Sequence, residues 1–191
     1  MISPLYESAP PAWVKKNIHL LEGAVLIRNL GSEERRLNKH EQVFGANIAF
    51  RKWVVDRWKF DTNYGPAGKE LLLGDETMFI ENLHQNNLYG VWVPEAKVQH
   101  FVPQKRTSLN FVHRYFVAMG RTQVRLDGAP EGKRILGVPR SLFRQWAESI
   151  SKAYFYRSFG SNKWFTYFLN AAELKGRIIE SKKKPLTQVM S

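Results

Sequence analysis

Apolar side chains recur at the spacing of an α-helix in several stretches of the chain. They predict helices at 51–58, from about 75 to 85, and at 108–126, where Ser108 is a suitable N-cap residue. Two more amphipathic helices are predicted after residue 140. Their apolar stripes consist of Leu142, Phe143, Trp146, Ile150 and Tyr154, and of Phe165, Phe168, Ala172 and Ile179.

Other stretches have the β-branched or alternating pattern of strands. They are residues 23–30 (GAVLIRNL), 43–50 (VFGANIAF) and 89–101 (YGVWVPEAKVQHF), the last broken near Pro94. Prolines and glycines predict a loop over 1–12 and a linker over 128–139. The pattern indicates an α/β fold with a short mixed sheet, in which no glycine-rich phosphate loop such as GxGxxG occurs.

Composition adds a strong basic bias to this picture. The 191 residues carry a formal net charge of +12 and no cysteine, so disulfides and thiolate metal sites are excluded. Residues 1–131 contain 17 Lys and Arg against 14 Asp and Glu, whereas residues 132–191 contain 12 against 3. The positive charge therefore belongs mostly to the last third of the chain, which we expect to attract phosphate groups.

Three short segments carry candidate chemistry. Asp75 and Glu76 stand at a predicted helix start, where acids are common for dipole reasons alone, but where a carboxylate can also act as a general base. His100 ends a predicted strand and is either a partly buried structural histidine or a metal ligand. Gly45 and Asn47 combine a permissive backbone with an amide donor and acceptor, and a plain turn is the alternative.

The order of these segments resembles the motifs of family 2 glycosyltransferases. Residues 45–51 (GANIAFR) resemble the family's G-x-N-x-A-x-R segment, and a segment like 60–68 follows in the family. Gly74 with its two acids is similar to the family's G-E-D motif. Residues 94–100 (PEAKVQH) resemble P-x-A-x-V-x-H, with Arg106 a few residues later.

The resemblance covers roughly Glu7 to Arg125 and is specific as an ordered set. Even residues 7–13 (ESAPPAW) are similar to a loop that precedes this half in some bacterial members. It implies a GT-A fold, a nucleotide-sugar donor, a saccharide or lipid-linked acceptor, and inversion at the anomeric carbon. The predicted domains are residues 1–127 as the acceptor-binding half, 128–139 as a linker and 140–191 as a basic helical extension.

The resemblance also implies roles for individual residues. The family's catalytic base is the second acid of its motif, and Glu76 holds that place; because the two acids are reversed here, Asp75 remains an alternative. His100 matches a family histidine that completes a divalent metal site, for Mg or Mn, or contacts the donor's phosphates. The residues expected to bind substrate are Gly45, Asn47, Gly74 and Arg106.

The largest departure from the family lies before Met1. The family's nucleotide-binding half, with its Asp-x-Asp metal motif, precedes this point by roughly a hundred residues, and this sequence contains no Asp-x-Asp. We therefore expect most metal ligands to lie outside this chain and the chain alone to have little or no transferase activity. A fragment, a truncated gene product and a split protein are all consistent with this pattern.

The basic C-terminal helices leave two interpretations open. They either pack as ordinary helices or bind an anionic membrane surface through their aromatic and basic side chains. A nucleic-acid-binding module is a further alternative, though no helix-turn-helix, zinc-finger or RNP-like motif supports it. With no secretory signal pattern and no apolar run of about 18 residues, we expect a cytoplasmic protein, either soluble or peripheral on the inner face of the plasma membrane.

Overall fold

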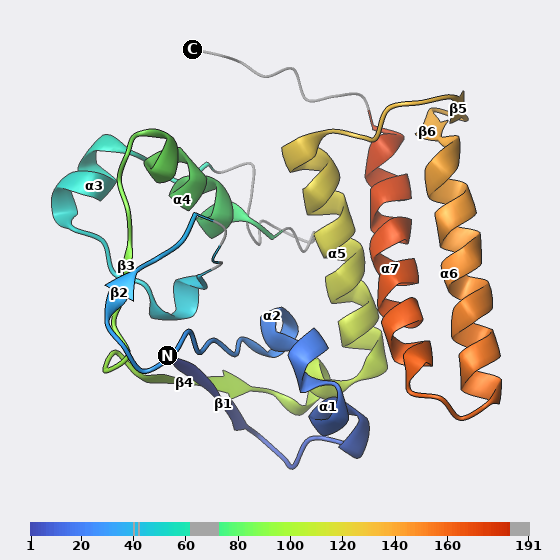
Figure 1. Cartoon of the computed structure of the whole chain (residues 1–191), viewed down its shortest axis with the longest axis horizontal. Helices are drawn as coiled ribbons and strands as arrows, with labels where there is room; N and C mark the ends of the chain where they lie inside the picture. The colour runs from blue at the N-terminus through green and yellow to red at the C-terminus, as the bar shows by residue number, and fades with distance from the viewer. Residues whose placement is uncertain (40, 42, 62–72, 184–191) are drawn as a thin grey trace. The chain divides into compact units, whose positions relative to one another are not determined.

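The computed structural model describes residues 1–39, 41, 43–61 and 73–183 of the chain (Figure 1). The chain divides into two compact units, Met1–Ser108 and Leu109–Ser191, which we call unit 1 and unit 2. The fold is mixed α/β, as predicted, but the strands in these described ranges form three separate two-stranded sheets rather than one mixed sheet. Most of the segment 60–68 discussed above lies outside the described residues.

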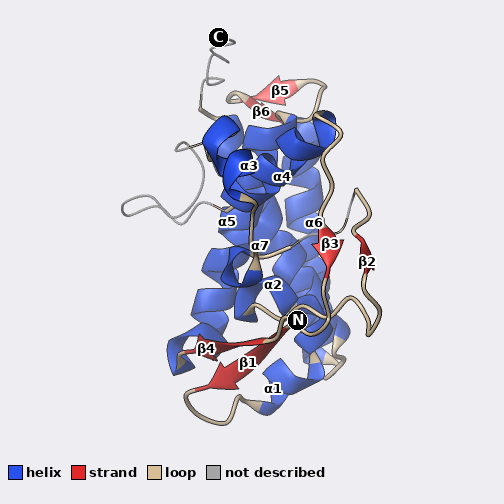
Figure 2. Cartoon of the chain, turned by 90° about the vertical axis from the view of Figure 1, so that its left-hand side faces the viewer, coloured by secondary structure: helices blue, strands red, loops and turns tan. Residues whose placement is uncertain are grey.

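The main sheet of unit 1 pairs β1 (Ile2–Tyr6) with β4 (Val98–Val102) in parallel (Figure 2). Ile2 and Val102 turn toward the core and are buried. Leu5 and Phe101 lie opposite each other on the other face, with 48% and 53% of their surface exposed. A second, antiparallel pair joins β2 (Arg35–Arg36) to β3 (Val91–Trp92). The predicted strands near 89–101 are thus confirmed, with the break around Pro94.

Two helices of unit 1 form a compact pair that carries the candidate site. α3 (Lys52–Arg57) and α4 (Asp75–Gln85) begin and end close to the predicted bounds. Val54 packs against Phe79 and Leu83 in a buried cluster, and Phe60 stacks on Phe79 with ring centroids 4.2 Å apart. This apolar contact fixes the direction of α4 and therefore the position of its first residues.

Three local predictions for unit 1 are wrong. Residues 2–6 form strand β1 because they pair with β4. Residues 23–30 contain the short helix α2 (Glu22–Val25), after which Leu26 turns the chain with a φ of 55°. Residues 45–47 form η2, a single 3₁₀ turn, instead of a strand. The remaining short helices of the unit are α1 (Ala12–Lys16), η1 (Ile18–Leu20) and η3 (Gln104–Thr107).

Unit 2 is built from three helices of 19 residues each: α5 (Leu109–Asp127), α6 (Arg140–Ser158) and α7 (Lys163–Ser181). α7 lies between the other two (Figure 1). The three predicted helices are confirmed, and the segment expected as a linker contains the hairpin of β5 (Arg134–Ile135) and β6 (Val138–Pro139). α5, which the expected domain bounds grouped with residues 1–127, packs in the structure against α7.

The α5–α7 contact is close because glycines face each other across it. A Cβ added to Gly120 would collide with the carbonyl oxygen of Glu173, and one added to Gly176 would collide with that of Val117. Beside this seam, Glu180 is buried and accepts hydrogen bonds from two arginines of α5, Arg121 at 2.8 Å and Arg125 at 2.6 Å. Unit 2 therefore combines tight backbone packing with a buried ion cluster.

Candidate functional site

The first turn of α4 presents the two candidate acids. Gly74 directly precedes the helix with a φ of 103°, a left-handed conformation that glycine adopts without steric cost. Asp75 and Glu76 then occupy the first turn, where the helix dipole favours negative charge. The helix and its start are as the sequence predicts.

Glu76 is held by a contact from a distant segment. The backbone N–H of Gly45 donates a hydrogen bond of 3.1 Å to its Oε1. A Cβ at position 45 would collide with that oxygen, so only glycine permits this approach. Burial, followed by a side-chain hydrogen bond with Asp75, raises the pKa of Glu76 above its usual value, against smaller opposing effects from backbone N–H groups.

Asn47 fixes the other end of the same 3₁₀ turn. Its Nδ2 donates to the carbonyl oxygen of Met1 at 3.0 Å and to that of Ala96 at 2.8 Å. Ala96 lies just before β4, and Met1 lies just before β1. η2 therefore joins the start of α4 to the start of the parallel sheet, and the Asn47 amide has a structural role in this arrangement.

His100 lies in the middle of β4, in register with Pro4 of β1. Its Nδ1 is buried and accepts or donates no hydrogen bond within the described part of the chain. Burial, and then the nearby positive charge of Arg106, lowers the pKa of His100, so the imidazole is neutral near pH 7. A neutral imidazole has a lone pair on one of its two ring nitrogens, and the tautomer decides which of them can bind a ligand.

Arg106 lies in η3, which follows β4 directly. The start of η3 is held by Glu7, whose carboxylate accepts a 2.7 Å hydrogen bond from the backbone N–H of Gln104. Sequence reasoning placed Glu7 in a family-like loop but missed this contact. It also missed the backbone of Ala96, although the spacing of the P-x-A-x-V-x-H segment points to that position.

The predicted residues thus fall into two groups. Hydrogen bonds bring Gly45, Asn47 and Glu76 together, with Asp75 and Gly74 adjoining through the helix start. His100 and Arg106 are neighbours at β4 and η3. Among the described residues no hydrogen bond links His100 to Glu76, so hydrogen bonds do not join the two groups directly.

A metal ion of the kind that the resemblance implies does not fit the described residues alone. They contain no group of three or more His, Asp or Glu side chains that could hold a metal. His100 offers one nitrogen, which is fewer ligands than any stable divalent site uses. The prediction that most metal ligands lie outside this chain stays a prediction.

Comparisons with protein-family models, curated proteins and solved structures find no match for this chain. In the described ranges, none of the helices has the length and apolarity that a membrane crossing needs. The site must therefore be interpreted from its own chemistry. A half-buried carboxylate at a helix start, with a raised pKa and a hydrogen bond from a distant backbone N–H, is a candidate general base.

Proposed function

We propose that this chain is the acceptor-side part of a family 2 glycosyltransferase with a GT-A fold. It acts with a nucleotide-sugar-binding part to move a sugar onto a saccharide or lipid-linked acceptor hydroxyl. One observation carries the proposal. The hydrogen bond from the Gly45 N–H to Glu76 joins two motif-like segments that lie 31 residues apart.

Glu76 is the general base in this proposal. Its carboxylate removes the proton of the acceptor hydroxyl while the hydroxyl oxygen bonds to the anomeric carbon of the donor. The bond from that carbon to the phosphate oxygen breaks, and the nucleotide leaves with the electron pair. The raised pKa of Glu76 increases its basicity, and the Gly45 N–H limits the movement of the carboxylate. Asp75 supports it through the side-chain hydrogen bond that the two acids share.

The other motif-like residues have positioning or binding roles. Asn47 holds η2 against the start of β4, so that Gly45 stays in reach of Glu76. Gly74 permits the sharp turn into α4. His100, which is neutral, and Arg106, which is positively charged, form a separate group. It is suited to bind the phosphates of the nucleotide sugar or a shared Mg or Mn ion.

The parallel sheet gives independent support for a second part. Parallel strands are normally covered on both faces. Here Leu5 and Phe101 lie side by side on a face that is about half exposed. A nucleotide-binding part that extends and covers this sheet would bury both side chains.

The test has a genetic and a biochemical arm. The DNA upstream of the Met1 codon is expected to encode a strand–helix segment with an Asp-x-Asp motif, in the same frame or a neighbouring one. Joined to that segment, or mixed with it, this chain is expected to transfer sugar from a labelled nucleotide sugar, whereas neither part alone does so. Unrelated upstream coding, or a well-folded joined protein that transfers no sugar from any nucleotide sugar, contradicts the proposal.

A further inference from the structure

One end of unit 2 exposes an unusual number of aromatic side chains. At the turn between α6 and α7, Tyr154, Phe155 and Phe159 are 71%, 58% and 72% exposed. The rings of Phe155 and Phe159 contact each other with centroids 4.8 Å apart. We call these three residues, together with Trp164 at the start of α7, the aromatic tip. A single exposed apolar residue is common on protein surfaces, whereas adjacent exposed phenylalanine rings form a patch of the kind that marks an interaction site.

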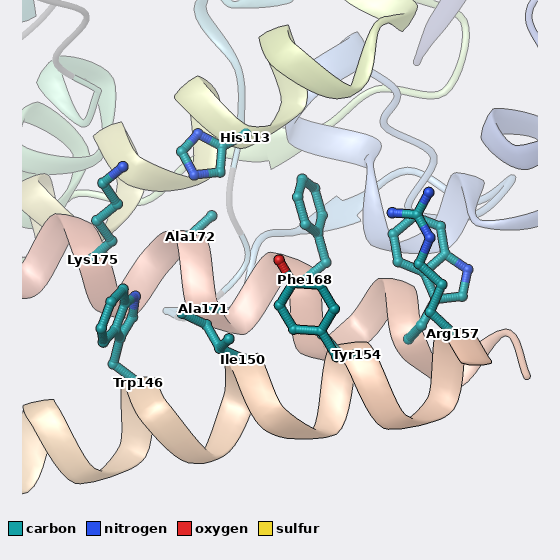
Figure 3. Close-up of a pocket in the computed structure, with 11 residues that line it drawn as sticks. His113, Trp146, Ile150, Tyr154, Arg157, Phe168, Ala171, Ala172 and Lys175 are labelled. Carbon is teal, nitrogen blue, oxygen red and sulfur yellow. The ribbon is translucent and has the colours of Figure 1, made fainter. Parts of the chain in front are cut away.

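A groove adjoins the aromatic tip and runs between the three helices (Figure 3). Its volume is about 340 Å³. Ala171 and Ala172 of α7 line it with small side chains, while rings of Trp146, Tyr154 and Phe168 stand around it. The groove therefore combines apolar and basic lining and is wide enough for part of a small amphiphilic molecule.

Basic side chains lie beside the aromatic tip and in the groove, and no acidic side chain is among the residues that line the groove. Residues 149–172 contain eight aromatic residues and no Asp or Glu. Arg157 lies over the ring of Trp164 at 5.3 Å, and Lys163 lies 5.7 Å from the ring of Tyr156. Arg157 and Lys175 also line the groove. This surface is positively charged and apolar at once, which complements a ligand that is anionic and apolar.

The ionisation of a groove histidine agrees with this charge. His113 of α5 lines the groove beside Lys175. Burial, and then the charge of Lys175, lowers the pKa of His113. His113 is therefore neutral near pH 7, and Lys175 is the neighbouring cation that an anionic ligand in the groove would meet.

We propose that the aromatic tip and its groove dock unit 2 onto a bilayer that contains anionic phospholipid. Aromatic rings enter the headgroup level of a bilayer, and neighbouring Lys and Arg side chains bind the lipid phosphates. Duplex nucleic acid is a poorer occupant, because binding through about six to ten phosphate contacts needs two to three times as many cations as Arg157, Lys163 and Lys175 supply. The docking concerns unit 2 and does not depend on the role of Glu76.

Co-sedimentation of the full chain with vesicles at an ionic strength of about 0.1 M tests the proposal. Vesicles of phosphatidylglycerol mixed with phosphatidylcholine are compared with phosphatidylcholine alone. The chain is expected to bind the mixed vesicles and not the neutral ones. R157Q/K163Q neutralises two cations at the tip. Because each cation contributes about fivefold to binding, the partition coefficient is expected to fall about 30-fold. Removing two rings in F155A/F159A is expected to lower it about tenfold.

Matched controls lie at the other end of α6, beside the β5–β6 hairpin (Figure 1). K133Q/R140Q removes two exposed cations there, and I135A/L136A removes two exposed apolar side chains. A helix of this length separates the two ends by about 28 Å, well beyond a Debye length of about 10 Å. Both control variants are therefore expected to change vesicle binding by less than about threefold. All four variants change exposed positions, so circular dichroism is expected to show unchanged helix content.

Three results would overturn the proposal. Equal losses in the tip and control variants would mean that net charge alone drives binding. Vesicle binding that survives in the tip variants, while binding to generic duplex DNA is lost, would make the tip a nucleic-acid surface. Absent vesicle binding together with a dimer that F155A/F159A abolishes would make it a contact between copies of this chain.

Discussion

Different kinds of contact stabilise the interior of unit 1 and the interior of unit 2. Unit 1 consists of short helices and two-stranded sheets, and single polar contacts, such as those of Asn47 and Gly45, join its motif-like segments. Unit 2 consists of three long helices with interlocked glycines and a buried ion cluster. The candidate site lies in unit 1, where substitutions are expected to affect the site more than the stability of the fold. In unit 2, core substitutions are expected to change stability first.

The largest expected effect is a loss of unit 2 stability when a glycine of the α5–α7 seam is replaced. G176A places a methyl group against the carbonyl oxygen of Val117, and neither backbone can yield without separating the helices. We expect unfolding to require about 3 kcal/mol less free energy, as judged by urea titration followed by circular dichroism. N170A, at an exposed position of the same helix, is the control and should leave the midpoint nearly unchanged. Equal midpoints for the two variants would refute the close seam.

Removing the charge of the buried carboxylate should have a similar but pH-dependent effect. Burial alone would raise the pKa of Glu180, but the hydrogen bonds from Arg121 and Arg125 outweigh it and lower the pKa. E180Q removes the buried carboxylate to which Arg121 and Arg125 both donate, and we expect a loss of about 3 kcal/mol at pH 7.

The pH dependence follows from the sign of that shift. A depressed folded-state pKa gives stability that is present above the ordinary glutamate pKa and is lost as the pH falls through the folded value. The difference in unfolding free energy between wild type and E180Q should therefore become smaller at acidic pH. A difference that stays constant from neutral to acidic pH would show that the ion cluster does not control it.

The corresponding glycine-to-alanine substitution in unit 1, G45A, is expected to change the candidate site and not the stability of the fold. G45A pushes a methyl group against the flexible end of Glu76, so the carboxylate moves and the backbone does not. We expect sugar transfer by the joined protein to fall roughly 100-fold, as a displacement of about 1 Å can cause. The unfolding midpoint should change little.

G90A is the control for this experiment. Its added methyl group meets only the end of the Leu37 side chain, away from the acids. Transfer should remain close to wild type. If G90A and G45A lose activity alike, close packing in general, and not the contact with Glu76, limits the rate.

The smallest expected effect is on the stability of E76Q. Because the pKa of Glu76 is raised, its ionised form opposes folding, and this penalty develops as the pH rises through the folded pKa. Glutamine removes the charge and keeps an oxygen for the Gly45 N–H. The variant should be as stable as wild type at pH 7, within about 0.5 kcal/mol, or more stable. A clear loss of stability would assign Glu76 a structural role.

The contrast between the units also explains what sequence reasoning could predict. The long helices of unit 2 follow from their apolar stripes, because a periodic face determines a helix locally. Strand β1 was missed because Pro4 and its neighbours pair with β4, which is more than ninety residues away in the sequence. The pattern over 43–50 favours a strand, and the alternative of a turn at Gly45 and Asn47 is the one that forms, since Glu76 and Ala96 hold it. Only the ordered family-like motifs linked these segments in advance.

The most direct measurement of the central claim is the rate of sugar transfer by the joined protein in three single variants of α4. E76Q should reduce the rate by at least about 100-fold, as expected for the loss of a general base. D75N should reduce it much less, and E81Q, at an exposed position of the same helix, should leave it unchanged. An E76Q protein that transfers sugar at the wild-type rate, or a larger loss in D75N than in E76Q, would contradict the assignment of Glu76 as the base.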